Sequence, residues 1–132
     1  MINQTVYIVD DDEAMRDSLE WLLESAGINV ETFGSALIFL EKIKLEYNDE
    51  WARYNPCCLI TDVCMPGMSG LELQDALIAS GISLPTIIIT GHGNEAMAAD
   101  ALHKGAIEFF NKPFSGEALL KRINTALEIP ET

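Results

Sequence analysis

Five short apolar runs, each followed by a segment with helical periodicity, constrain the fold of this chain more than any other feature of its sequence. The runs cover residues 5–9, 28–33, 57–61, 86–90 and 106–110. The segments between them repeat apolar residues at helical spacing, as residues 36–43 do at positions i, i+3, i+4 and i+7. Strands that alternate with helices predict a doubly wound α/β sandwich, in which right-handed crossovers make the sheet parallel and place helices on both faces.

Capping residues and glycines predict where five helices begin and end. Asp12 can cap a first helix that Gly27 stops, and Ser115 can cap the last. The other helices are expected after Gly34-Ser35, over about 71–80 and over 94–104. Residues 46–56 are polar and aromatic without a clear period, so they either extend the second helix or cross back to the sheet.

Composition excludes several classes of protein. The 132 residues form one domain, and no apolar run approaches the ~20 residues of a membrane span. A net charge of −13 argues against binding of nucleic acid phosphates by this chain. The three cysteines, Cys57, Cys58 and Cys64, lack the spacing of a disulfide framework or a zinc site. They favour a reducing, cytoplasmic location, and the N-terminus lacks the pattern of a secretory signal.

Polar residues gather where three of the predicted strands end. The first strand leads into four acidic residues, 10–13, the third leads into Asp62 within a turn rich in Pro and Gly, and the fourth leads into Thr90-Gly91. Ligands of open parallel sheets bind at the carboxyl ends of the strands. If these strands are neighbours, the sequence predicts a site for a divalent cation and a phosphoryl group.

These motifs together resemble the receiver domain of two-component response regulators. The resemblance rests on Asp10-Asp11, on the segment 62–70 with its Met-Pro-Gly-Met-Ser-Gly, on Thr90-Gly91 and on Lys112-Pro113-Phe114. It leans toward transcriptional regulators of the FixJ/NarL kind through residues 90–93 and 105–114. It covers essentially the whole chain, so residues 1–132 are expected to be a single receiver domain. The implied fold is flavodoxin-like, with strand order 2-1-3-4-5.

The resemblance assigns roles to the residues at the strand ends. Asp62 is the implied phosphoacceptor; its alternative role, capping the next helix, is disfavoured by the intervening residues 67–70. Mg²⁺ is the implied cofactor, with Asp11, Asp62 and the Cys64 carbonyl as ligands and Asp10 orienting a bound water. Lys112, after an implied cis bond to Pro113, would offset phosphoryl charge. Asp12 and Glu13 fit helix capping better than metal binding.

A second set of residues is implied to read the phosphoryl group. Thr90 would donate its hydroxyl and move inward, and Phe109 would change its rotamer with it. Gly91 leaves room beside the phosphate, and His92 and Cys64 lie where the family tunes the lifetime of the acyl phosphate. Phe109 can equally be a core aromatic, and His92 an ordinary loop residue.

The implied partner is a sensor histidine kinase. Residues 94–128 carry four cations against five acids, which is close to neutral, and include the surface of the fourth helix, fifth strand and fifth helix. That surface would meet an output domain or, when phosphorylated, a second copy of the chain. DNA would be bound only through a separate output domain, so the chain is expected to be the N-terminal part of a longer regulator. It would catalyse only its own phosphorylation and dephosphorylation.

Three alternatives remain at this point. The chain can be a stand-alone receiver that acts through protein contacts. It can be a phosphatase of the haloacid dehalogenase kind with Asp10 as nucleophile, although the expected residue at Ala14 and a second acidic pair are missing. It can also be a flavin or nucleotide module, although the acidic residues after the first strand would repel a phosphate.

Overall fold

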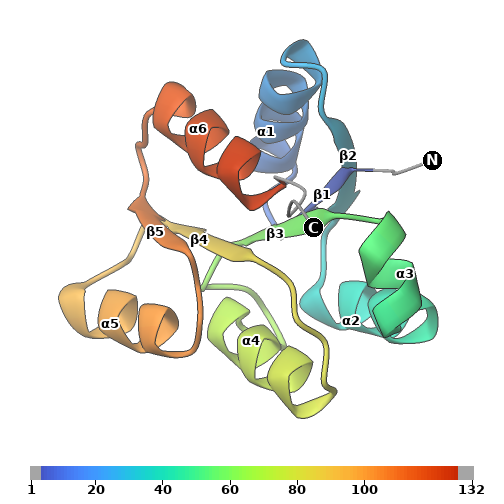
Figure 1. The fold of residues 1–132 in the computed structure, drawn as a ribbon. Coiled ribbons are helices and arrows are strands. Elements are labelled where there is room, and N and C mark those ends of the chain that lie inside the picture. Colours follow the sequence, from blue (N-terminus) through green and yellow to red (C-terminus); the bar gives the residue numbers. More distant parts are fainter. Residues whose placement is uncertain (1–3, 128–132) are drawn as a thin grey trace.

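A central parallel sheet of five strands forms the frame of the molecule (Figure 1). The computed structural model describes residues 4–127. The strand order is β2-β1-β3-β4-β5, which confirms the predicted flavodoxin-like arrangement. The strands are β1 (Thr5–Val9), β2 (Asn29–Phe33), β3 (Cys57–Thr61), β4 (Thr86–Thr90) and β5 (Glu108–Asn111).

Helices cover both faces of this sheet (Figure 1). They are α1 (Glu13–Ser25), α2 (Ala36–Glu46), α3 (Asp49–Tyr54), α4 (Gly70–Ala79), α5 (Glu95–His103) and α6 (Gly116–Ala126). One apolar cluster joins α1 and α6 to the sheet, and a second joins α2 and α4 to the opposite face. Every residue of β3 and β4 is buried, as expected for central strands covered on both sides.

The helix α3 corrects the prediction of five helices. Asn48 caps it, because its side-chain oxygen accepts a hydrogen bond from the Trp51 amide at 2.8 Å. The six residues of α3 include none that is buried, so no apolar stripe marks the helix in the sequence. Its contact with the preceding segment is the packing of Trp51 on Tyr47, with ring centroids 5.9 Å apart.

The last strand begins two residues later than the predicted range 106–110. The Ala106 amide donates to the Ala101 carbonyl at 3.0 Å, which closes the end of α5 before the strand can start. Similarly, β2 starts at Asn29 and not at residue 28, because the Ile28 amide bonds back to the Leu23 carbonyl in α1. Both boundaries are set by backbone bonds at helix ends, which apolar patterning does not report.

The three cysteines are unpaired thiols. Cys57 and Cys58 lie inside the sheet, and burial raises the pKa of each to about 12, so both stay protonated at neutral pH. Cys64 is exposed. Among residues 4–127, no helix has the length and apolar character needed to cross a bilayer.

Candidate functional site

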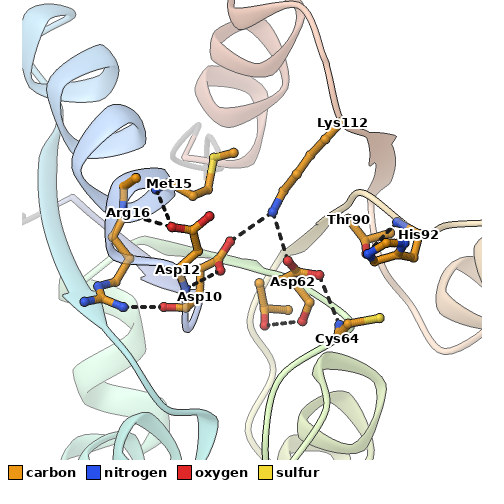
Figure 2. Close-up of polar contacts among 11 residues, drawn as sticks. Asp10, Asp12, Met15, Arg16, Asp62, Cys64, Thr90, His92 and Lys112 are labelled. Atoms are coloured by element: carbon orange, nitrogen blue, oxygen red, sulfur yellow. Dashed lines mark hydrogen bonds and ion pairs between the residues drawn. The ribbon is translucent and has the colours of Figure 1, made fainter.

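The carboxyl ends of β1, β3, β4 and β5 bring the predicted polar residues together at one edge of the sheet (Figure 2). β1 and β3 end in register, so Asp10 and Asp62, which follow them, lie side by side. Lys112 follows β5, and its amide donates to the Thr90 carbonyl at 2.9 Å. The parallel sheet therefore assembles a site from residues separated by as many as 102 positions.

Asp62 is held by one donor on each carboxylate oxygen. Its Oδ2 accepts from the Lys112 ammonium at 2.9 Å, and its Oδ1 accepts from the Cys64 amide at 3.0 Å. Asp62 as a whole residue is only 8% exposed. The following turn returns close to it, since a Cβ on Gly70 would overlap the Asp62 carbonyl oxygen. Only glycine fits at this first residue of α4.

Asp10 is even more buried, at 3% exposure. Its Oδ1 accepts from the Asp12 amide at 2.9 Å, and its Oδ2 contacts the Lys112 ammonium at 3.3 Å. Burial raises the pKa of Asp10; the Asp12 amide and Lys112 offset part of that rise, while the nearby Asp62 adds to it. The two neighbouring carboxylates thus favour a cation between or beside them.

Lys112 is the cation that the structure shows in contact with both aspartates. The Lys112–Pro113 peptide is cis, as predicted. Burial alone would lower the pKa of Lys112, but the hydrogen bond to Asp62 and the charge of Asp10 more than offset it, so the pKa is raised. The ammonium therefore stays charged at neutral pH.

The remaining acidic residues of the loop have different surroundings. Asp11 is exposed, and within residues 4–127 its carboxylate makes no hydrogen bond or ion pair. Asp12 caps α1 by accepting from the amides of Ala14 and Met15, as predicted. In the described part of the chain no three His, Cys, Asp or Glu side chains converge in a ready-made metal site.

Thr90 is fully buried at the end of β4. Its hydroxyl accepts from the His92 amide at 3.4 Å, and in the described residues it makes no hydrogen bond to Asp62 (Figure 2). His92 itself is exposed. Gly91 lies beside the lysine stem, because a Cβ there would be 3.9 Å from Lys112 Cδ. Thr90 and His92 lie on the side of Asp62 away from Asp10 (Figure 2).

Phe109 lies on β5 and is half-buried. It packs against a small apolar cluster that includes Val63 and Ile88. The loop after β4 crosses its ring so closely that a Cβ on Gly93 would be 2.7 Å from Phe109 Cε1. Phe109 is thus a core aromatic in contact with the Thr90 loop, and its role as a switch stays a prediction.

Two residues at the site were not identified from the sequence. Arg16 donates from Nη1 to the Asp10 carbonyl at 2.7 Å, and Gly70 makes the close approach to Asp62 described above. One feature of the sequence distinguished Arg16, since it is the sole lysine or arginine in the first 41 residues, close to the acidic run 10–13. Its partner is a backbone atom, however, and side-chain patterns do not reveal such contacts.

Residues 6–124 match the family of response regulator receiver domains. The chain belongs to this family. It is 44% identical over 124 residues to the response regulator protein TodT of Pseudomonas putida, covering 94% of this chain and 51% of TodT. It is 39% identical over 127 residues to the transcriptional regulatory protein FixJ of Bradyrhizobium diazoefficiens, covering 96% of this chain and 58% of FixJ.

Solved structures agree with this assignment. The crystal structure of FixJ-N superposes with a TM-score of 0.82 at 37% identity, covering 100% of this chain and 99% of that one. The response regulator StyR superposes with a TM-score of 0.81 at 44% identity, covering 95% of this chain and 59% of StyR. This receiver domain therefore spans about half the length of the curated relatives it matches. Receiver domains of response regulators are signalling modules of two-component systems.

Proposed function

We propose that this receiver domain accepts a phosphoryl group from a sensor histidine kinase on Asp62. The acyl phosphate then shifts the conformation of the α5-β5-α6 face to control an output. This face is the one predicted above as the fourth helix, fifth strand and fifth helix, renumbered because α3 is an additional helix. The observation that carries the proposal is the setting of Asp62. Its carboxylate is nearly buried at the carboxyl edge of the sheet, with Lys112 Nζ at 2.9 Å from one oxygen and the Cys64 amide at 3.0 Å from the other.

Asp62 has the properties of a nucleophile in phosphoryl transfer. One carboxylate oxygen attacks the phosphorus of a phosphohistidine, an O–P bond forms, and the N–P bond to the imidazole breaks. The leaving imidazole takes up a proton from solvent and the phosphoryl group stays on Asp62 as an acyl phosphate. Lys112, already within hydrogen-bond distance of Asp62, offsets the negative charge of the transferred group. Hydrolysis of the acyl phosphate by water restores the carboxylate.

Magnesium fits the donors present at this edge of the sheet. Carboxylate and carbonyl oxygens are the ligands that Mg²⁺ prefers. Asp10 and Asp62 both face one ammonium in the structure, which supports a cation in contact with both. Asp11 lies exposed on the same loop and the Cys64 carbonyl follows Asp62, so these residues would complete the site. When bound, the cation would neutralise charge on the phosphoryl oxygens.

A population shift would transmit the signal. In the structure the Thr90 hydroxyl accepts a bond from the His92 amide, and within residues 4–127 it donates to no acceptor. A phosphoryl group on Asp62 would offer its proton a charged acceptor. Movement of Thr90 would be followed by Phe109, whose ring touches that loop. Moving the equilibrium from almost fully inactive to almost fully active needs about 5.5 kcal/mol. Several charge-assisted hydrogen bonds of ~1.5–3 kcal/mol each can supply it.

The output of this domain is proposed to be transcriptional. The relatives include the transcriptional regulatory proteins FixJ and TdiR, and they are about twice as long as the matched region. A DNA-binding output in the same polypeptide would fit those lengths, and a second copy of the chain would pair on the α5-β5-α6 face. The alternative is a stand-alone receiver that signals through protein contacts, and the length of the open reading frame distinguishes the two.

The local geometry disfavours a phosphatase that uses Asp10 as nucleophile. Asp12, which would have to act as its acid, is engaged in capping α1 through the amides of Ala14 and Met15. Asp10 is 3% exposed, with its oxygens bonded to the Asp12 amide and to Lys112. Asp62 is less buried than Asp10, at 8% exposure, and its carboxylate accepts from the Cys64 amide and from Lys112.

Phosphorylation by acetyl phosphate tests the proposal directly. The protein is incubated with acetyl phosphate and Mg²⁺, and intact-mass spectrometry follows the addition of a phosphoryl group. One labile phosphate per chain is expected, removable by hydroxylamine as an acyl phosphate should be. Asp62→Asn is expected to abolish it, and Asp12→Asn is the matched control that should still be labelled.

Other outcomes would point elsewhere. Rapid multiple turnover that survives Asp62→Asn would support a hydrolase. A complete lack of labelling in the wild-type protein, with its fold confirmed by circular dichroism, would contradict phosphoryl transfer to this site.

A further inference from the structure

Arg16 is a charged side chain that the proposed chemistry does not yet use. It lies in the first turn of α1 and is half-buried, and its Nη1 donates to the Asp10 carbonyl at 2.7 Å (Figure 2). Within residues 4–127 its guanidinium forms no ion pair with a carboxylate, although it is beside the acidic loop. Its one hydrogen bond in the described residues is therefore to the backbone of the acidic loop.

The bonded carbonyl belongs to the peptide that joins Asp10 to Asp11. Because a peptide unit is planar, holding its oxygen sets the orientation of the whole unit. That orientation limits the directions in which both carboxylates leave the loop. Two backbone amides are tied nearby, that of Asp10 to the Phe33 carbonyl at 3.1 Å and that of Asp12 to Asp10 Oδ1 at 2.9 Å. The Arg16 bond ties the peptide between them to α1.

Gly34, between β2 and α2, leaves room for the guanidinium. A Cβ on Gly34 would be 3.2 Å from Arg16 Nη1 and 3.6 Å from Cζ. The guanidinium thus occupies the space that Gly34, which has no side chain, leaves beside the Asp10 carbonyl. A half-buried arginine packed in this way can hold a hydrogen bond better than a solvated arginine on a helix surface.

We propose that Arg16 is a positioning residue for the cation site: its hydrogen bond to the Asp10 carbonyl holds the Asp10–Asp11 peptide so that both carboxylates are presented to Mg²⁺. This inference rests on the proposed function, because it assumes that the acidic loop binds the cation. It assigns to Arg16 a structural contact with the loop and no contact with the phosphoryl group.

The sign of the effect separates positioning from simple charge balance. Arg16 is permanently positive, so as a mere charge it repels Mg²⁺, and removing it should tighten binding of the cation. As a positioning residue, its removal should weaken binding, since loss of a group that orients metal ligands costs roughly 10–100-fold in affinity.

Calorimetric titration of the metal-stripped protein with Mg²⁺ tests the inference. Arg16→Met is expected to raise the dissociation constant for Mg²⁺ roughly tenfold, within the range seen for residues that orient metal ligands. Arg16→Lys, which keeps the charge and has a single donor nitrogen, is expected to fall between Arg16→Met and wild type. Lys42→Met is the control: it removes the same charge from a lysine that pairs with Glu31 and Glu46 and should leave the affinity unchanged.

A second variant guards against misfolding of Arg16→Met. Gly34→Ala keeps the arginine and its charge but places a methyl group against the guanidinium, so it should also weaken Mg²⁺ binding. Folded Arg16→Met with equal or tighter affinity would overturn the inference. If that variant does not fold, unchanged affinity in Gly34→Ala would overturn it. Failure of the wild-type protein to bind Mg²⁺ would instead contradict the proposed function itself.

Discussion

Asp10 shows how burial and charge compete within a single residue. Its carboxylate is almost inaccessible, and its pKa is raised mainly by that burial. A group whose pKa is higher in the folded state than in the unfolded state stabilises the fold below its unfolded pKa. That contribution is lost as the pH rises through the folded pKa. At neutral pH the ionised Asp10 therefore costs stability as long as no divalent cation is bound.

Asp10→Asn is expected to stabilise the metal-free protein at neutral pH and so to raise its Tm. The amide keeps an acceptor for the Asp12 N–H but carries no charge. Thermal unfolding in chelator over a pH series measures the difference. The gain should disappear at acidic pH, where Asp10 is protonated, and a gain independent of pH would contradict the explanation.

Gly70 and Gly116 offer a matched comparison, because each is the first residue of a helix. Gly70→Ala is expected to destabilise the fold by more than about 2 kcal/mol, since its Cβ would overlap the Asp62 carbonyl and displace the phosphoacceptor turn. Gly116→Ala would meet only the two methyl groups of the flexible Leu22 side chain, at 3.3 and 3.5 Å, and should change stability by less than about 1 kcal/mol. Chemical denaturation measures both, and equal effects would refute the packing argument.

Among the elements, the central strands carry the stability that the site depends on. β4 is buried along its whole length and ends with the site residue Thr90, and Asp62 follows β3 directly. Each helix except α3 buries residues against the sheet, while the outer faces leave large residues in solvent, such as Ile38 of α2 at 60% exposure.

Ile87→Ala in β4 is expected to cost about 2–5 kcal/mol, because it leaves a cavity in the cluster beneath α1 and α6. Ile38→Ala removes the same atoms from an exposed position and should stay within about 0.5 kcal/mol of wild type. Urea unfolding of the two variants makes the comparison. Similar losses in both would mean that the burial pattern of the sheet is wrong.

At the scale of the whole molecule, the net charge of −13 and the proposed cation site both bear on stability. Magnesium that binds only the folded state should stabilise it by about 2.7 kcal/mol at a hundredfold excess over its Kd. The Tm should therefore rise with Mg²⁺ and fall again with chelator. Sodium chloride at matched ionic strength is the control, and an equal rise with it would show that screening of the acidic surface explains the effect.

Much of the architecture was predictable because it is encoded in local patterns. The strands at 5–9, 57–61 and 86–90 were predicted to the residue, and Asp12 and Ser115 were recognised as helix caps. Helix α3 escaped prediction because it buries no residue, and β5 began late because a backbone bond at the end of α5 delayed it.

The residues that form the site could also be predicted, since acidic, hydroxyl and lysine residues stand at the ends of apolar strands, and parallel strands end at one edge of the sheet. Asp10, Asp62, Thr90 and Lys112 do lie together there, although the sequence pattern does not tell which atoms touch. Asp11 was expected to be a direct ligand of the cation, and in the structure it is exposed. Its role as a ligand stays a prediction.

The sequence by itself determined the order of strands and helices, the edge where chemistry gathers and the residue types found there, because these depend on periodicity and on turns between neighbouring residues. Only the tertiary structure decided that one ammonium contacts two aspartates, that Asp10 is buried while Asp11 is exposed, and that Arg16 binds the backbone between them. Such contacts join residues whose distances are set by the packing of helices on the sheet, and that packing has no local signature in the chain.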